Sequence, residues 1–173
     1  MNEAALKCLK ERRSIRAYKA EQVGEVALQA VLEAGLYTPT AMGKQSPKMV
    51  VVQDAALLAK LSKMNADVMN ATSDPFYGAP MVVIVFADSS IPTYVYDGSL
   101  VMGNLMNAAH AVGLGSCWIH RAKEMFESEE GKALKAQWGM AESYVGIANC
   151  ILGYTDGEYP KPKERKADYI VRT

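Results

Sequence analysis

The sequence predicts an α+β fold in preference to a doubly wound parallel sheet. Helical and strand patterns alternate along the 173 residues, but the strand patterns are short and few. Half of the residues are apolar, and 19 basic side chains balance 19 acidic ones. A chain of this length and composition can form one domain with a sizeable core, covering residues 1–173, and is too short for two ordinary domains.

The N-terminal part of the chain predicts two helices and a long loop. A short helix ends near Arg12, and a second runs from about residue 22 to 36. The loop "TPTAMGKQSPK" follows, because Pro39, Gly43 and Pro47 interrupt any regular pattern there. The apolar residues of the second helix are expected on one face: Val23, Val26, Ala27, Ala30, Val31 and Ala34.

The middle of the chain predicts two buried strands and two helices. The β-branched run at residues 49–53 and the segment "MVVIVFA" at 81–87 are strand patterns. A helix is expected between them at 55–69. The longest helix, at about 94–112, is apolar on almost every side, which predicts a central, buried helix.

The C-terminal part predicts two more strands and a tail. Strand patterns lie near residues 116–119 and at 144–154, with one or two amphipathic helices over 122–138 between them. The tail, residues 155–173, has little apolar mass and two prolines. It cannot build a core of its own, so we expect it to lie extended on a surface.

The composition argues against several classes of partner and site. The zero net charge gives no overall attraction to nucleic acid or membrane, so any anion site must be local. The longest apolar run is too short to span a membrane, and the N-terminus lacks the apolar region of a secretory signal. Cys8, Cys117 and Cys150 are odd in number and widely spaced, which favours free thiols in a reducing compartment over a metal site. We therefore expect a cytoplasmic protein without a metal.

Three features that could suggest catalysis have simpler explanations. "GLGS" at 113–116 follows a helix and does not precede one, so Gly113 is expected to end that helix in the left-handed conformation. Cys117 falls in an apolar strand as an inert thiol, and His110 falls inside the apolar helix as a core or interface residue. No serine elbow or acid pair is present, so no side chain is predicted to be catalytic.

Basic residues gather near both ends of this neutral chain. Arg12, Arg13 and Arg16 surround Ser14, and "KPKERK" concentrates further cations in the tail. One interpretation is a solvated helix end, where cations interact favourably with the helix dipole. The other is convergence of both clusters on a phosphate monoester, for which arginine forks, a serine hydroxyl and lysines are suitable groups. The residues alone lead no further than a phosphate-bearing small ligand.

The order of five motifs resembles the FMN-dependent nitroreductase family. They are "RRSIRAY", "TPTAMGKQSPK", "FYGAP", "GLGSCWI" and the final pair "LGY" and "PKPKER", so the resemblance covers about residues 8–166. It implies a homodimer of α+β subunits, each with a mostly antiparallel sheet and a long central helix at the dimer interface. It also implies two FMN molecules at that interface, and a tail at residues 155–173 that wraps the partner subunit.

The resemblance also implies which residues bind FMN. The backbone amide near His120 would point at flavin N5, and the loop of the partner chain would approach the isoalloxazine ring. The residues concerned are Arg12, Arg13, Ser14 and Arg16 for the phosphate and ribityl oxygens, with Lys163 or Arg165 completing the phosphate site; Pro39, Thr40, Ala41, Gly43 and Gln45 in the loop; Trp118 and Ile119 at the back wall of the ring; and His120 through its backbone.

The chain departs from the family pattern within the loop. The commoner pattern has asparagine where Gly43 stands, and Pro-Trp where this chain has Ser46 and Pro47. The loss of a side-chain amide and of an aromatic ring changes the contacts near the flavin. We expect the change to affect the range of substrates more than flavin binding.

The resemblance implies an NAD(P)H-dependent FMN oxidoreductase. NADH or NADPH would deliver hydride to the flavin and leave, and a nitroaromatic, quinone or similar acceptor would then take its place. This ping-pong reaction requires no protein acid or base. Two alternatives remain open: an FMN-binding member of the family with a specialised substrate or little NAD(P)H turnover, and a phospholigand-binding protein without a flavin.

Overall fold

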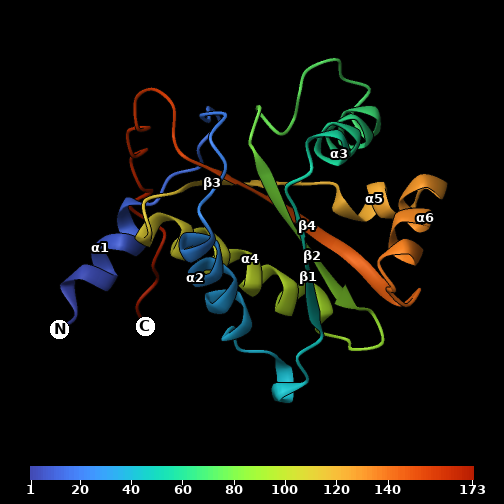
Figure 1. Cartoon of the computed structure of the whole chain (residues 1–173). Helices are drawn as coiled ribbons and strands as arrows, with labels where there is room; N and C mark the ends of the chain where they lie inside the picture. The colour runs from blue at the N-terminus through green and yellow to red at the C-terminus, as the bar shows by residue number, and fades with distance from the viewer.

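A four-stranded antiparallel sheet runs through the centre of the computed structural model, which describes residues 1–173 (Figure 1). The strands are β1 (Pro47–Val52), β2 (Met81–Asp88), β3 (Gly115–Ile119) and β4 (Tyr144–Gly153), in the order β1-β2-β4-β3. The helices are α1 (Glu3–Glu11), α2 (Glu25–Leu36), α3 (Ala55–Val68), α4 (Tyr94–Ala111), α5 (Ala122–Glu127) and α6 (Glu129–Gln137), with a 3-10 turn, η1 (Ala41–Gly43). The expected α+β fold with an antiparallel sheet is confirmed.

Helices cover both faces of the sheet (Figure 1). The side chains of β2 alternate between two apolar clusters, as the period of two in a strand requires. Ile84 and Phe86 pack in the cluster that includes residues of α3, α5 and α6. Val83 and Val85 pack in the cluster that includes residues of α2 and α4. The sheet is therefore the middle layer between two layers of helices.

Local sequence signals explain where several helices begin and end. The side chain of Asp54 accepts a hydrogen bond from the N–H of Leu57 (2.8 Å) and so caps α3. Ser128 caps α6 in the same way, through the N–H of Gly131 (3.0 Å). Gly113 has φ +82° just after α4, which is the left-handed conformation expected of the residue that ends this helix.

The buried face of α2 differs from the sequence prediction. The residues that the helix buries are Leu28, Val31 and Gly35. The prediction is wrong for Val26 and Ala30, which are both exposed. The reason is the close approach of α4: a Cβ at Gly35 would lie 3.0 Å from Leu105, so the face that carries this glycine is the one that packs.

The long helix α4 is buried on one face only. Leu105 and Ala109 are fully buried, whereas Tyr96 and Leu100 are 71% and 49% exposed. The prediction of a helix buried on almost every side is therefore wrong for a single chain. The second apolar face of α4 is open to solvent.

The sheet has two edge strands, β1 and β3. β1 begins with Pro47 and Lys48, and the ammonium group of Lys48 lies 4.5 Å from the centre of the Tyr144 ring. The segment that follows α1 runs beside β3. The tail, residues 156–173, is exposed and contains no helix or strand, as expected from its composition.

Candidate functional site

The segment that follows α1 lies against the outer edge of β3. The N–H of Ile15 donates to the carbonyl oxygen of Ser116 (2.9 Å), and Ser14 pairs with Ser116 in an isolated parallel bridge. The approach is close, because a Cβ at Gly115 would lie 3.0 Å from Ile15. These contacts bring "RRSIR" beside "GLGSCWI", two motifs that are far apart in the sequence.

Three polar groups in these two motifs are buried without a hydrogen-bond partner in the chain. They are Nη1 of Arg12, Nε of Arg13 and Oγ of Ser116. Nη1 of Arg13 donates to the carbonyl oxygens of Lys10 and Arg12, both at 2.8 Å, which orients its guanidinium group. Buried groups without partners cost about 1–3 kcal/mol each. An anion that accepted hydrogen bonds from the arginines would remove that cost.

Arg16 lies farther along the same segment and is exposed. Its guanidinium carbon is 6.0 Å from the centre of the Tyr77 ring, at the limit of a cation–π contact. Tyr18 anchors the segment, because its hydroxyl donates to the carbonyl oxygen of Ile15 (2.7 Å). Burial raises the pKa of Tyr18 well above its ordinary value of 10.0.

The tail starts beside this arginine segment. The hydroxyl of Tyr159 accepts a hydrogen bond from the N–H of Arg13 (3.0 Å) and lies 3.1 Å from Nδ1 of His110 on α4. Lys163 and Arg165 are exposed and form no ion pair within the chain. The structure therefore brings Tyr159, near the start of the tail, to the arginines. It leaves Lys163 and Arg165 without an ion-pair partner.

The three residues predicted around the flavin ring, Trp118, Ile119 and His120, lie at the other end of β3. Ile119 is buried in the cluster shared with α3 and α5, Trp118 packs on the α2 and α4 side, and His120 is exposed. The backbone N–H groups of His120 and Arg121 donate no hydrogen bond within the chain, and Arg121 has φ +72°. Free, consecutive N–H groups are suited to bind an acceptor atom of a ligand.

The loop between α2 and β1 is held by a buried carboxylate. Asp97 of α4 is 3% exposed, and it accepts hydrogen bonds from the N–H of Ala41 (3.1 Å) and the hydroxyl of Ser46 (3.0 Å). Within the loop, Oγ1 of Thr40 accepts from the N–H of Gln45 (3.0 Å). Several donors of this loop thus find their acceptors inside one chain.

The backbone of the same loop is strained. Met42 and Gln45 have φ of 52° and 49°, values that residues with a side chain rarely adopt, and Gly43 has φ 63°. Pro39 is exposed, and a Cβ at Gly43 would meet nothing within 4 Å. Strain of this kind is concentrated at binding sites in proteins.

The loop and the arginine segment lie at opposite ends of the sheet. Pro47, which directly follows the loop, pairs with Ala87 of β2. Ser116, which contacts the arginine segment, pairs with Leu152, and Leu152 pairs with Met81. Met81 and Ala87 are six residues apart on one strand, which is about 20 Å at roughly 3.3 Å per residue. One chain therefore does not bring all predicted FMN contacts together.

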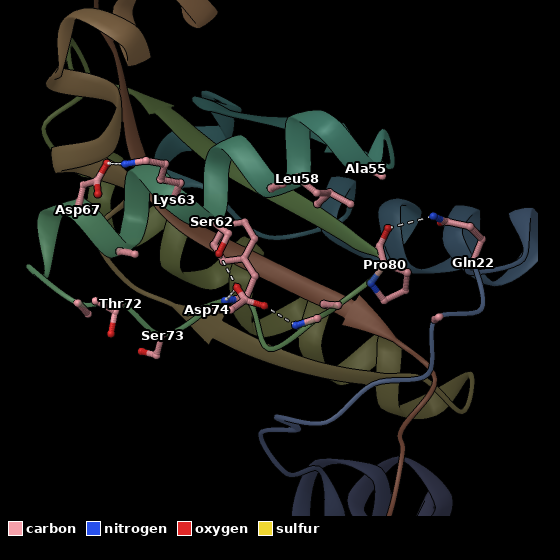
Figure 2. A pocket seen from close by; sticks show the side chains of 17 residues that line it. Gln22, Ala55, Leu58, Ser62, Lys63, Asp67, Thr72, Ser73, Asp74 and Pro80 are labelled. Atoms are coloured by element: carbon pink, nitrogen blue, oxygen red, sulfur yellow. Dashed lines mark hydrogen bonds and ion pairs between the residues drawn. The ribbon is translucent and has the colours of Figure 1, made fainter.

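A groove with a volume of about 780 Å³ lies at a different place, between α3 and residues 71–80 (Figure 2). Four of its polar side chains pair with one another. Ser62 donates to Asp74, and Lys63 forms an ion pair with Asp67 (2.6 Å). None of the residues predicted to bind FMN lines this groove.

The cysteines and the possible metal ligands of the chain form no second site. Cys117 is buried, and burial raises the pKa of the Cys150 thiol well above its ordinary value of 9.0. No group of three His, Cys, Asp or Glu side chains is arranged to hold a metal ion. None of the helices is both long enough and apolar enough to cross a membrane.

Sequence reasoning missed three residues near the predicted site. An acidic residue in an otherwise apolar helix is a signal that could have identified Asp97. Ser116 stands inside a quoted motif, but only its position beside Ser14 shows why its hydroxyl matters. Tyr159 carries no local signal, because its contact with Arg13 joins opposite ends of the chain.

Comparison with known proteins gives consistent matches. The model of the nitroreductase family matches residues 9–76 and 69–154. A protein from Archaeoglobus fulgidus, described by name as an NADH dehydrogenase/NAD(P)H nitroreductase, is 30% identical over 96% of this chain and 90% of its own length. The structure of a nitroreductase with bound FMN from Bacteroides fragilis has a TM-score of 0.91 and 28% identity, with 100% of both chains covered. An FMN-dependent nitroreductase from Clostridium difficile has a TM-score of 0.89 and 25% identity, again over 100% of both chains.

Proposed function

Since the chain belongs to the nitroreductase family, we propose that it is an FMN-dependent oxidoreductase that takes electrons from NADH or NADPH. The observation that carries this proposal is the set of buried, unpaired donors on Arg12 and Arg13, beside Ser14 and Ser116. The relatives from Bacteroides fragilis and Clostridium difficile are FMN proteins by name. FMN supplies the hydride chemistry when it is bound, and the residues of this chain hold and orient it.

The arginine segment suits the phosphate of FMN. A phosphate monoester carries close to two negative charges and three acceptor oxygens. Charge-assisted hydrogen bonds to such a group contribute about 1.5–3 kcal/mol each. We assign Arg12, Arg13, Ser14 and Arg16 to the phosphate and ribityl oxygens. A cation of the tail, Lys163 or Arg165, completes the phosphate site.

We propose a homodimer in which each FMN contacts both chains. The loop at 39–45 and the arginine segment lie at opposite ends of one sheet, so a site that uses both requires two copies of the chain. Exposed apolar side chains on α2, α4 and the tail support an interface there: Leu36, Tyr37, Tyr96, Leu100, Tyr169, Ile170 and Val171. In this arrangement residues 1–173 form one domain, and the tail at 155–173 wraps the partner subunit.

We propose a broad range of electron acceptors, including nitroaromatics and quinones. Gly43 stands where the commoner family pattern has asparagine, and no atom lies within 4 Å of the place where its Cβ would be. The open loop leaves volume for bulky acceptors beside Trp118 and Ile119. A steady-state comparison of small and bulky acceptors tests this. One small acceptor that exceeded all the others a hundredfold would contradict it.

Titration of the purified protein with FMN tests the central proposal. We expect one FMN per chain, complete reduction of the bound flavin by NADH or NADPH without oxygen, and reoxidation by a quinone or nitroaromatic after the nicotinamide product is removed. Bound flavin that NAD(P)H does not reduce would favour a family member with a specialised substrate. Failure to bind FMN, with binding of another phosphate monoester, would favour a phospholigand-binding protein.

A further inference from the structure

Two buried asparagines converge on the end of β3. Nδ2 of Asn65, on α3, donates to the carbonyl oxygen of His120 (2.7 Å). Nδ2 of Asn149, on β4, lies 3.3 Å from the carbonyl oxygen of Ile119 and 3.5 Å from that of His120. Both asparagines are 0% exposed, and both contact Sδ of Met125. Carboxamides from two elements therefore hold two consecutive carbonyl groups.

As part of the apolar core, this pair of asparagines lowers the stability of the fold. The Oδ1 atoms of Asn65 and Asn149 are buried and accept no hydrogen bond from the chain. They lie against an apolar cluster that includes Ile119 and Met125. A buried polar atom without a partner is destabilising, whereas an apolar side chain of the same shape avoids that loss. What the asparagines contribute in return, within this chain, is their hold on the carbonyl groups of Ile119 and His120.

The carbonyl groups that they hold fix the direction of the N–H groups in the same peptides. In a trans peptide the C=O and N–H bonds point in opposite directions, and the chain contains no cis peptide. Holding the carbonyl groups of Ile119 and His120 toward the interior turns the N–H groups of His120 and Arg121 away from it. Neither N–H has a partner within the chain. The left-handed conformation of Arg121, with φ +72°, accompanies this turn.

We propose that Asn65 and Asn149 are positioning residues that aim the N–H groups of His120 and Arg121 at the polar edge of the flavin. N5 and the neighbouring carbonyl oxygen of the ring are the acceptors at that edge. This inference rests on the proposed function and on the placement of the flavin ring at this end of β3, which the family resemblance implies. Donors that a rigid interior already holds in place need not reorganise when charge develops on the ligand, and this favours the reaction. The two carboxamides act through the backbone and not by contact with the ring.

Asn149→Leu tests the proposal, with Asn65→Leu as a second variant. Leu61→Met is the matched control, because it changes the same cluster but keeps both carboxamides and their contacts with Sδ of Met125. Hydrogen exchange of the His120 and Arg121 amides is followed by NMR with and without saturating FMN. In wild type and control, FMN slows exchange of both amides at least about tenfold, which corresponds to roughly 1.4 kcal/mol. In the asparagine variants this protection is lost although FMN still binds at the arginine segment. The kcat with NADH falls, and the KM for NADH is unchanged.

Each outcome of this experiment is decisive. Wild-type protection of both amides in a folded leucine variant overturns the proposal. Failure of both leucine variants to fold also overturns it, because the argument requires that leucine be tolerated in this cluster. If wild-type protein binds FMN but the two amides stay unprotected, the positioning role fails alone. If wild-type protein binds no FMN, the proposed function fails.

Discussion

The arginine segment and the loop at 39–45 are assigned to one cofactor, but the fold treats their polar groups in opposite ways. Around Arg12 and Arg13, buried donors are left without partners. In the loop, Asp97 and Thr40 satisfy the backbone and hydroxyl donors inside the same chain. The buried donors of the arginine segment lack acceptors unless an anion binds. The loop has its own acceptor, Asp97, and lies at the far end of the sheet. We interpret the difference as a division of tasks, in which one chain binds the phosphate and its partner covers the ring.

The largest expected effect is on FMN affinity and comes from reversing a charge in the arginine segment. Arg12→Glu removes a donor and places a carboxylate against the phosphate, so it should weaken FMN binding at least ~100-fold, or about 3 kcal/mol at roughly 1.4 kcal/mol per decade. Quenching of flavin fluorescence measures the affinity, and circular dichroism checks the fold. Lys132→Glu, at an exposed position on α6, makes the same charge change far from the site. Wild-type FMN affinity in folded Arg12→Glu protein would show that Arg12 does not bind the phosphate.

Mixed dimers test whether the two regions belong to different chains. Arg12→Glu and Pro39→Glu homodimers should each bind FMN poorly, because every site in them carries a change. A mixed dimer of the two variants, isolated with two affinity tags, should bind one FMN per dimer with nearly wild-type affinity. One of its sites receives both changes and the other receives none. A mixed dimer that binds no FMN would place both regions in a site made by one chain.

In the FMN-free protein, the loop should matter more for the free energy of unfolding than the arginine segment, which is the reverse of their order in FMN affinity. Asp97→Ala leaves the N–H of Ala41 and the hydroxyl of Ser46 without their acceptor, so it should lower the free energy of unfolding by about 2–4 kcal/mol. Arg12→Ala should not lower it, because the buried Nη1 of Arg12 has no partner to lose and its burial without one costs about 1–3 kcal/mol. Urea denaturation measures both. A larger loss for Arg12→Ala than for Asp97→Ala would reverse the comparison.

The smallest effect is a loss of stability in alkaline solution at the arginine end of the sheet. Burial raises the pKa of Tyr18 and Cys150 above their ordinary values of 10.0 and 9.0, so both stay protonated in the folded chain after the unfolded chain has ionised. The unfolded state then binds fewer protons, and the free energy of unfolding falls as pH rises above about 9. Below that pH the contribution is fully present.

Tyr18→Phe isolates one part of this pH dependence. The variant should lose about 1 kcal/mol at neutral pH with its hydrogen bond to Ile15. Its stability should then decline less steeply than that of wild type between about pH 10 and 11. Urea denaturation over a pH series measures both quantities. Identical slopes in the two proteins would show that Tyr18 does not titrate with unfolding.

The sequence was sufficient where one segment determines its own structure. The β-branched run at 81–87 predicted the buried strand β2, and Gly113 predicted the end of α4. Prediction failed where a neighbouring element determines which face of a helix is buried. The buried face of α2 depends on the approach of Leu105 to Gly35, which no pattern within α2 can specify. The exposed face of α4 likewise depends on whether a second chain is present.

The candidate site shows the same limit. The arginine cluster was visible in the sequence, but the unpaired state of its donors depends on contacts with β3 and with Tyr159. The resemblance named the loop without giving its distance from the arginines, which follows from the strand register. Asn65 and Asn149 carry no signal in the sequence, because their shared target at His120 exists only after α3, β3 and β4 have packed.

The open edge of β1 affects how readily partly unfolded chains aggregate. It has a strand neighbour on one side only, so the outer N–H and C=O groups of Met49 to Val52 are a template for any other extended chain. Pro47 and Lys48 protect only its first two positions, by a missing donor and by a charge that resists burial. Precipitation of partly unfolded chains is therefore expected to compete with refolding after heating. We therefore expect the recovery of the protein after heating to depend on its rate of aggregation as well as on its equilibrium stability.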